Sequence, residues 1–376
     1  MKLVIITHVP HYVQNGQYYA YMPYVKEMNI WIANAKKVTV VAPRRDAPPS
    51  VIDMPYKHTA ISLKSITEFN LLSARNIIAS VFALPRICIT IFKAMHSADH
   101  IHLRCPGNVG LVGCLVQIFF PRKPKTAKYA GNWDPNAVQP LSYKLQKLIL
   151  NNTFLTRNMT VIVYGDWPGS SRNIKPFFTA TYREADIVPV PARNLAQIKL
   201  LFVGTLSPGK QPLLAVQIAE ALISRNFPVT LDFYGEGSEA AGLHNYIQSR
   251  QLGELVTMHG NQSEVVVRAA YQNSHVLILP SKSEGWPKVV AEAMFWGCVP
   301  MVTPVSCVPE MLAHGNRGII ISGNLNNDID VLAETILNSE KYNTMAANGM
   351  LWARRYTLDY FEAEIKNILM KDKSTR

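Results

Sequence analysis

The sequence predicts an α/β protein built from two doubly wound parallel-sheet domains in series. The chain has 376 residues, which at about 100–200 residues per domain is enough for two or three domains. Short apolar runs alternate with stretches of helical periodicity, once from Leu3 and again from Lys199, as is typical of βαβ units. The composition agrees, because 48% hydrophobic residues with 13 Phe, 16 Tyr and 6 Trp exclude a disordered or low-complexity chain.

The first domain is expected to begin with a buried strand at Leu3–Ile6. A loop follows, then a helix from about Tyr18 and a second strand at Lys37–Ala42, which Pro43 ends. Parallel doubly wound sheets bind ligands at the carboxyl ends of their strands. Gly16 lies in this first loop, where the lack of a Cβ would let a ligand approach the backbone.

The net charge of +12 comes from the first half of the chain. Up to residue 195 there are 23 Lys and Arg against 9 Asp and Glu, a net +14, whereas the remainder holds 15 against 17, a net −2. A merely solubilising surface would be expected to spread over both halves, so we favour a functional basic face that meets an anionic partner. Nucleic acid is disfavoured as that partner, because no helix-turn-helix, zinc-finger or RNA-recognition pattern accompanies the charge.

Two apolar stretches of the first half suggest contact with a membrane. Ile77–Phe92 has Arg86 as its one charge, but its 16 residues fall short of the ~20 that span a bilayer. A buried helix is the favoured interpretation, and an interfacial membrane helix is the alternative. Val109–Phe120 is followed at once by basic residues, and apolar surface beside clustered cations is a pattern that binds anionic lipid headgroups. These basic residues are Arg122, Lys123, Lys125 and Lys128.

The cysteines and the first strand indicate a cytoplasmic protein. Five scattered cysteines without a CxxC pair argue against a disulfide framework or a zinc site and fit a reducing compartment. The apolar run before His8 is too short for the core of a signal peptide. Because the sequence shows no cluster of metal-ligating residues, no metal cofactor is expected.

A proline-containing break at 186–196 is expected to link the two domains. Two sheets in series would leave a cleft between the domains, which is a preferred place for ligands. The strands expected after the break are Lys199–Val203, Val229–Tyr234, Leu255–His259 and Val276–Leu279, and the helices are Pro212–Ser224 and Ala240–Arg250.

The stretch HVLILPSKSEGWPKVVAEAMFWGCVPMV (275–302) contains the pattern that predicts a ligand-binding site. A buried strand ends in a polar loop, and Pro287 suits the first position of a helix that runs to about Trp296 and stops at Gly297. A further strand follows at Cys298–Val302. The loop and the helix N-terminus would therefore direct unpaired backbone N–H groups and the helix dipole at the end of the strand, which is how phosphate groups are bound.

Glu284 and Glu292 flank the start of this helix with an E-x7-E spacing. A carboxylate accepts hydrogen bonds from two hydroxyl groups, so an acidic pair beside a phosphate site suits sugar hydroxyls on either side of a diphosphate. The structural alternative is that Glu284 favours the helix N-terminus and Glu292 lies on a solvated face.

The segment EGWPKVVAEAMFWGCVPMVTPVSCVPEML resembles the donor-site signature of retaining glycosyltransferases of the GT-B fold, family 4 (glycosyl transferases group 1), roughly EGxPxxxxEAxxxGxPVxxxxxxxxxE. The resemblance includes LLFVGTLSPGKQPLLAVQIAEAL and LDFYGEGSE and covers about residues 198–322. It implies two Rossmann-like domains that face each other across a cleft. The acceptor-binding domain would be 1–190, the nucleotide-sugar-binding domain 196–350, and 351–376 a C-terminal helix packing back on the first domain.

The resemblance assigns roles to particular residues. Glu284 would bind hydroxyls of the donor sugar, Glu292 would bind the nucleotide ribose, and Lys210 would neutralise the diphosphate leaving group, which stabilises the charge that develops in the transition state. The alternative for Lys210 is an exposed loop lysine. The backbone of Gly285, Trp286, Pro287, Lys288 and Val289 would line the diphosphate. The other donor-binding positions implied are Gly204, Thr205, Gly235, Gly237, His259, Gly260 and Asn261, with Gly16 from the first domain.

Two departures from the family pattern matter. The family usually has an arginine where this chain has Thr205, so one cation of the usual pair is missing or supplied elsewhere, with Arg104 and Lys288 as candidates. The region where many members carry a histidine facing the sugar reads KYAGNWDP, with Asn132, Trp133 and Asp134. Arg104, Asn132 and Asp134 are therefore candidates for the acceptor or sugar side, and Asp134 is equally suited to cap a helix before Pro135.

The function that the resemblance implies is transfer of a hexose from a UDP- or GDP-sugar, with retention at the anomeric carbon and without a metal. The acceptor would be a saccharide or a polyprenyl-linked saccharide used for surface polysaccharide or glycolipid. The basic first domain would hold this acceptor at the inner face of the cell membrane, with Arg122–Lys128 and Lys144–Lys147 as the lipid-binding patches. The alternatives are a non-catalytic or an epimerase-type sugar-nucleotide-binding protein on the same fold.

Overall fold

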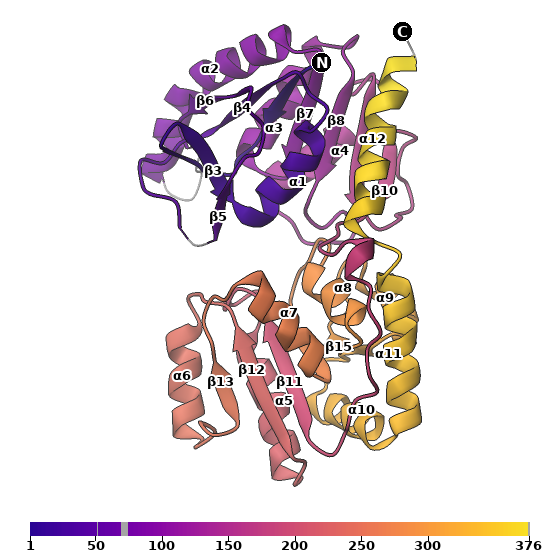
Figure 1. Ribbon diagram of the computed structural model, residues 1–376. Coiled ribbons are helices and arrows are strands. Elements are labelled where there is room, and N and C mark those ends of the chain that lie inside the picture. Colours follow the sequence, from indigo (N-terminus) through magenta and orange to yellow (C-terminus); the bar gives the residue numbers. More distant parts are fainter. Residues whose placement is uncertain (51, 69–73, 375–376) are drawn as a thin grey trace. The chain divides into compact units, whose positions relative to one another are not determined.

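The computed structural model describes residues 1–50, 52–68 and 74–374, which form two compact α/β units (Figure 1). Unit 1 comprises Met1–Phe177 and Glu362–Arg376, and unit 2 comprises Phe178–Phe361. Each unit is built around a parallel sheet, so the expectation of two doubly wound domains in series is confirmed. That the domains face each other across a cleft stays a prediction.

The chain divides between Phe177 and Phe178, 13 residues before the boundary expected at 190. The reason is that the segment after Phe177 packs on unit 2. The ring of Tyr182 lies 4.8 Å from that of Phe295 and 5.3 Å from that of Trp296, between ring centroids. Arg193 donates a hydrogen bond of 2.5 Å to the carbonyl of Trp296.

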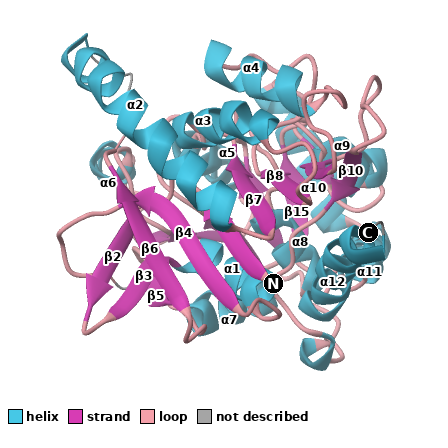
Figure 2. Cartoon of the chain, turned by 90° about the horizontal axis from the view of Figure 1, so that it is seen from above, coloured by secondary structure: helices cyan, strands magenta, loops and turns pink. Residues whose placement is uncertain are grey.

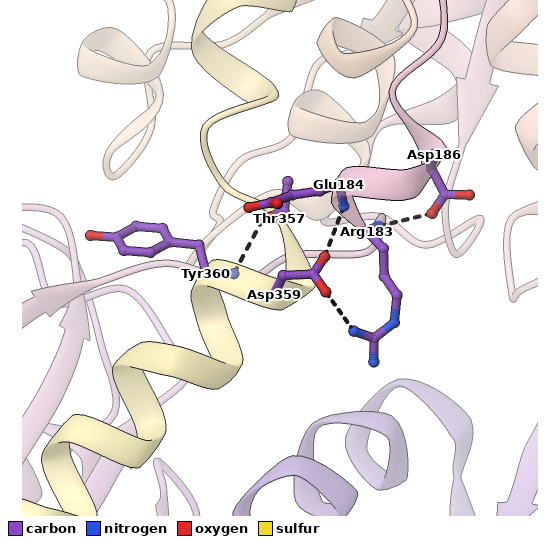
Figure 3. A network of polar contacts seen from close by, with 6 residues as sticks. All are labelled: Arg183, Glu184, Asp186, Thr357, Asp359 and Tyr360. Atoms are coloured by element: carbon purple, nitrogen blue, oxygen red, sulfur yellow. Dashed lines mark hydrogen bonds and ion pairs between the residues drawn. The ribbon is translucent and has the colours of Figure 1, made fainter.

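The C-terminal helix α12 (Leu358–Ser374) begins in unit 2, and its part from Glu362 onward groups with unit 1. Figure 3 shows what holds its first turn: the Asp359 carboxylate accepts hydrogen bonds of 2.8 Å from the backbone N–H of Glu184 and from the Arg183 guanidinium. These two donors hold the pKa of Asp359 below its usual range. The helix end is thereby fixed to the segment that follows the division of the chain.

The sheet of unit 1 is parallel throughout, in the order β10-β9-β8-β7-β1-β4-β6. The chain places β4 and β6 on one side of β1 and then continues with β7 on the other, so the strand order reverses between β1 and β7. The strands are β1 (Lys2–Ile6), β4 (Lys37–Pro43), β6 (Ile61–Ile66), β7 (His100–Cys105), β8 (Lys125–Tyr129), β9 (Met159–Tyr164) and β10 (Ile174–Phe177).

The connection after β1 differs from the expected loop and helix, because it contains the hairpin β2 (His11–Gln14) and β3 (Gln17–Tyr21). Asn15 and Gly16 form its turn, with φ of 51° and 74°, and Asn-Gly is the pair that a two-residue hairpin turn favours. The helix predicted from about Tyr18 is therefore wrong: Tyr18 lies in β3, and α1 spans Met22–Ile32. Strand β5 (Asp53–Pro55) pairs with β3.

The hairpin turn explains the glycine at position 16, and no neighbouring atom of the protein approaches its backbone closely enough to exclude a Cβ. Gly16 lies at the exposed tip of the hairpin, and a Cβ added to it would meet nothing within 4 Å. The positive φ of the turn is a sufficient reason for glycine at this position. A donor-binding role for Gly16 stays a prediction.

Helices cover both faces of the unit 1 sheet. Helices α2 (Ala74–Ser97), α3 (Asn108–Val116) and α4 (Leu141–Leu150), with the 3-10 helix η1 (Gln117–Phe119), lie side by side on one face (Figure 2). Alternate residues of β7 separate the two faces. Ile101, Leu103 and Cys105 join the core cluster under α2–α4, whereas the His102 ring lies 4.2 Å from that of Trp31 in α1.

The apolar stretch Ile77–Phe92 lies within α2 as expected, but the helix is amphipathic. From Phe82 onward, where its side chains are described, Ile87 and Ile91 are buried while Phe82 and Ile89 are exposed. The side chains of residues 77–81 lie outside the described residues.

The basic residues at Arg122–Lys128 do not form the predicted lipid-binding patch. Lys123 Nζ donates to the carbonyls at the C-terminal end of α2, which satisfies groups that lack helical partners. Lys125 is buried and donates to the carbonyl of Phe120, and burial lowers its pKa to about 8. Because Lys128 is also buried, Arg122 is the one member of this run that is exposed.

Lys128 belongs to a buried ionic cluster between α1, β7 and β8. Its Nζ lies 2.9 Å from one carboxylate oxygen of Glu27, and Arg104 Nη1 lies 2.7 Å from the other. Arg104 is 13% exposed and Lys128 1% exposed. One carboxylate therefore holds two cations away from water, on the face of the sheet that α1 covers.

Unit 2 has a parallel sheet in the order β13-β12-β11-β14-β15-β16. Its strands are β11 (Ile198–Val203), β12 (Val229–Tyr234), β13 (Val256–Met258), β14 (Val276–Leu279), β15 (Val299–Val302) and β16 (Ile319–Ile320). Its helices are α5 (Pro212–Ser224), α6 (Ala240–Ser249), α7 (Glu264–Asn273), α8 (Lys288–Phe295), α9 (Val308–Met311), α10 (Leu325–Leu337) and α11 (Ser339–Ala353). Every strand and helix predicted here is confirmed to within two residues.

Across the described residues, no helix is both long and apolar enough to cross a membrane.

The buried cluster predicts that Glu27 is a stability determinant of unit 1. Glu27→Gln removes the negative charge that both buried cations contact, which is expected to lower the free energy of unfolding by about 3–5 kcal/mol. Chemical unfolding followed by circular dichroism measures this change. Glu334→Gln, which breaks the exposed pair with Lys341, is the matched control and is expected to cost less than about 1 kcal/mol. Equal losses in the two variants would contradict the account.

Candidate functional site

The candidate site lies at the carboxyl edge of the unit 2 sheet, where the strand order reverses. The chain runs from β11 to β12 and β13 on one side, and then continues with β14 on the other side of β11. Ligands of doubly wound sheets bind outside the strand ends at such a reversal. The loops that follow β11 and β14 meet here, because the Lys282 N–H donates a 2.8 Å hydrogen bond to the carbonyl of Gly209.

Each of these two loops carries one of the two predicted catalytic side chains, and the structure brings them together. Lys210 Nζ forms an ion pair with a carboxylate oxygen of Glu284. Glu284 is 9% exposed and Lys210 27% exposed. An ammonium group has three donors, so Lys210 is able to hold Glu284 with one of them and offer the others to a second anion. The pair also cancels the carboxylate charge that would otherwise repel a phosphate.

Helix α8 begins directly after the Glu284 loop. Pro287 is the N-cap residue and Lys288 the first helical residue, one position later than predicted. No side chain among the described residues forms a capping hydrogen bond at this end, and the Val290 N–H donates a 3.0 Å hydrogen bond to the carbonyl of Pro287. A helix N-terminus that follows the carboxyl end of a parallel strand is suited to an anion. The carbonyl of Gly285 accepts hydrogen bonds from Ser306 Oγ (3.0 Å) and Cys307 Sγ (3.3 Å). These bonds hold the Glu284 loop against the residues that precede α9.

Glu292, in the second turn of α8, is held by two hydroxyl groups. Its carboxylate accepts hydrogen bonds from Thr181 Oγ1 (2.5 Å) and Tyr271 Oη (2.9 Å). The solvated-face alternative for Glu292 is therefore wrong. Binding to a ribose stays a prediction, and a ribose hydroxyl would share the carboxylate with these two donors.

The glycines of the LDFYGEGSE segment are explained by close backbone contact. A Cβ on Gly235 would lie 2.0 Å from the carbonyl oxygen of Gly204, and one on Gly237 would lie 2.3 Å from that of Leu206. Hydrogen bonds from Gly204 N to Tyr234 O and from Leu206 N to Glu236 O join the same two loops. The glycines thus bring the loop after β12 against the loop that leads to Lys210.

The predicted base-side residues lie beside these glycines. The His259 ring stacks on Tyr234, with centroids 4.5 Å apart, and its Nε2 lies 2.6 Å from Asp232 Oδ1. Asn261 donates a 3.2 Å hydrogen bond to Glu236. Gly260 adjoins them, and its carbonyl accepts from the N–H of Gly235.

The remaining positions of the α8 loop are also placed. The Trp286 ring lies 6.0 Å from Trp352 and 5.9 Å from Tyr356, between centroids, so it packs against the end of α11. Pro287 is buried, and Lys288 and Val289 are half-buried. Thr205, which occupies the family's arginine position, is exposed.

Sequence reasoning missed several residues that shape this site. Thr181 and Tyr271 come from segments outside the signature and are recognised only by their contacts with Glu292. Ser306 was within the quoted segment, but only its contact with the Gly285 carbonyl shows its role. Asp232 could have been predicted as a site residue, because it lies in β12 two residues before Tyr234, close to the carboxyl end of the strand.

The acceptor-side candidates lie in unit 1. Arg104 is held in the buried pair with Glu27, so as the replacement for the missing arginine it is not a free cation. Asn132 and Asp134 accept hydrogen bonds from the backbone N–H groups of Asp134 and Asn136, at 2.9 and 2.8 Å. Asp134 therefore caps a turn, and the alternative that it caps a helix is wrong, because α4 begins at Leu141. Acceptor roles for these three residues stay predictions.

Within residues 1–50, 52–68 and 74–374, no group of three His, Cys, Asp or Glu is placed to hold a metal ion.

Comparison with known proteins places this site in a family. The family model for glycosyl transferases group 1 matches residues 184–352, the segment that contains Lys210, Glu284 and Glu292. This segment is a glycosyl transferases group 1 domain. Together, the two parallel-sheet units have the GT-B fold, as the solved structures below also indicate.

The chain is similar in sequence to a curated protein and in fold to solved structures. An uncharacterized glycosyltransferase of Haemophilus influenzae is 27% identical over 187 residues, which cover 48% of this chain and 52% of that protein. The chain thus spans about half the length of this curated relative. Anabaena HepE, in a structure with UDP and glucose, is similar with a TM-score of 0.70 at 15% identity, over 100% of both chains. Sucrose-phosphate synthase of Thermosynechococcus elongatus is similar with a TM-score of 0.68 at 15% identity, also over 100% of both chains.

The contact between the glycine loops of the group 1 domain predicts an effect of a single methyl group. Gly237→Ala places a Cβ 2.3 Å from a backbone carbonyl, so the loops must separate, and the free energy of unfolding is expected to fall by about 1–3 kcal/mol. Gly242→Ala is the control, because this glycine lies in α6 with nothing within 4 Å of the added atom. It is expected to stabilise by about 0.5–1 kcal/mol. Chemical unfolding compares the two, and stabilisation by both would show that the loops are not in close contact.

Proposed function

We propose that the protein transfers a sugar from a nucleotide diphosphate sugar to an acceptor hydroxyl, with retention of the anomeric configuration. The single observation that carries the proposal is the ion pair of Lys210 and Glu284 at the strand reversal of a group 1 domain. This pair supports the proposal because it joins a cation to a carboxylate that is able to accept hydrogen bonds from hydroxyls, and Glu284 lies a few residues before the N-terminus of α8. A sugar diphosphate needs a cation, a hydroxyl acceptor and backbone N–H donors.

In the proposed reaction Lys210 and the backbone N–H groups at the start of α8 bind the diphosphate. The bond between the anomeric carbon and the phosphate oxygen breaks with its electron pair leaving on that oxygen, through an oxocarbenium-like state. Lys210 stabilises the negative charge that develops there. The acceptor oxygen bonds to the anomeric carbon from the face that the phosphate leaves, and the acceptor proton passes to the departing phosphate oxygen.

Glu284 is proposed to position the donor sugar. Its carboxylate is mostly shielded from water, and Lys210 occupies one of its two oxygens. The other oxygen is able to accept hydrogen bonds from two sugar hydroxyls. Fixing the sugar in this way aligns the anomeric carbon with the leaving oxygen, which is the positioning contribution to catalysis.

The proposed donor is a UDP-hexose, and the proposed acceptor is a saccharide or a polyprenyl-linked saccharide of surface polysaccharide or glycolipid. The similarity to HepE, whose structure contains UDP and glucose, supports UDP over GDP. The stacked pair of Tyr234 and His259 next to the glycine loops offers an aromatic surface for the base. Lys288, at the start of α8, is the proposed replacement for the arginine missing at Thr205.

Removal of the Lys210 charge tests the catalytic assignment. Lys210→Gln is expected to lower kcat about 100-fold or more, because the developing phosphate charge loses its fixed cation. Lys282→Gln is the matched control, since it removes an exposed lysine from the neighbouring loop and is expected to keep wild-type turnover. The assay follows UDP release with an acceptor panel, and product NMR reports the anomeric configuration. Equal turnover of the two variants would contradict the role of Lys210, and an inverted product would contradict retention.

Nucleotide preference tests the donor class and separates the enzyme from its alternatives. Thermal unfolding is measured with UDP-, GDP-, ADP- and dTDP-sugars, and UDP-sugars are expected to stabilise most. A ligand at a hundred times its Kd adds about 2.7 kcal/mol to the native state. Stabilisation without any transfer or donor hydrolysis would favour a non-catalytic binding protein, and interconversion of the donor sugar would favour an epimerase.

A further inference from the structure

Helices α2, α3 and α4 form one layer of unit 1 (Figure 2). Large apolar side chains of this layer and of the neighbouring η1 are exposed. Phe82 is 80% exposed, Phe119 72% and Leu141 83%. Soluble proteins rarely leave such side chains grouped at the surface unless the surface binds something. We define the apolar face by Phe82, Ile89, Phe119, Leu141, Leu148 and Phe154, all of them exposed.

Contacts join the apolar face across its elements. The rings of Phe92 in α2 and Phe119 in η1 lie 6.3 Å apart between centroids. Helix α3 packs against both α2 and α4, so the three helices form a continuous layer. Along α4, Leu141 and Leu148 are separated by two helical turns and therefore point the same way.

The helices that form this face carry charges of a single sign. Helices α2, α3 and α4 and η1 contain no aspartate or glutamate. Arg86 and Lys93 of α2 and Lys144 of α4 are exposed, and Arg157 lies 4.6 Å over the ring of Phe154. The lysines of Arg122–Lys128 are engaged inside unit 1. Of the two patches expected from the sequence, Arg122 and Lys144 therefore remain exposed, and Arg86, Lys93 and Arg157 are cations that lie outside both.

We propose that the apolar face binds the surface of an anionic lipid bilayer. Exposed Phe and Leu side chains enter the boundary between headgroups and acyl chains, while flanking arginines and lysines attract anionic headgroups. Charge complementarity selects this occupant. A second copy docked by the same face would set cations against cations with no acidic residue on these helices to pair them. A nucleic acid would neutralise the cations but leave the apolar side chains in water.

The inference is independent of the proposed sugar transfer, and its test needs no sugar nucleotide. Flotation measures binding of the full chain to phosphatidylcholine vesicles with and without phosphatidylglycerol. Wild-type protein is expected to float with the mixed vesicles and to dissociate as salt is raised. Failure to float, or equal flotation with both vesicles, would overturn the proposal.

Two matched sets of variants locate the surface. The triple variant Phe82→Ser, Leu141→Ser, Leu148→Ser is expected to lose at least about tenfold in binding, because its side chains no longer enter the bilayer. The control triple Val265→Ser, Leu337→Ser, Leu351→Ser removes equally exposed apolar side chains of unit 2 and is expected to bind as wild type. Circular dichroism confirms that each variant is folded. Equal losses in the two triples would overturn the location.

A charge series completes the test. Arg86→Gln, Lys93→Gln, Lys144→Gln is expected to weaken binding to mixed vesicles about fivefold per removed cation. Lys36→Gln, Lys37→Gln, Lys64→Gln removes the same charge from exposed lysines elsewhere in unit 1 and is expected to weaken it far less. If the two charge triples weakened binding equally, the interaction would depend only on net charge, and the proposal would be overturned. Light scattering adds a further criterion, because a wild-type dimer that the serine triple dissociates would assign the face to a second copy.

Discussion

The ion pair between Lys210 and Glu284 joins the two loops that form the candidate site. It exists because β11 and β14 are neighbours in the sheet while the chain departs from them in opposite directions, so their carboxyl-end loops meet. Other contacts serve this junction: Gly235 and Gly237 bring the loop after β12 against the β11 loop, and Ser306 holds the Gly285 carbonyl. The same loop that carries Glu284 leads directly into the N-terminus of α8.

Unit 2 was readily predicted from the sequence because its signals are local. Buried parallel strands appear as short apolar runs, and their helices begin and end at recognisable residues such as Pro212 and Gly297. The family resemblance implied that Lys210 and Glu284 serve the same donor site, but their direct ion pair is seen only in the structure. The partners of Glu292 were not predictable, since Thr181 is separated from it by 111 residues and nothing local marks it.

Unit 1 shows where local reasoning fails. The Asn15–Gly16 pair is a hairpin signal that was present in the sequence, and overlooking it gave a helix where β3 lies. For the lysines of Arg122–Lys128, by contrast, no local signal was available. Their composition predicts exposed side chains, but Lys128 is buried because it pairs with the Glu27 carboxylate, about a hundred residues earlier in the chain. A net charge of +14 therefore mixes cations that build the fold with cations that are free to meet a partner.

Binding of a UDP-sugar at the strand reversal of unit 2 can be measured by hydrogen exchange of the full chain with and without saturating UDP-glucose. Exchange reports local protection of backbone N–H groups. If the donor binds there, exchange is expected to slow at 204–211, 235–239 and 284–290 and to stay unchanged in α6 and β13. Protection confined to other segments, or no protection at a concentration that stabilises the protein, would contradict it.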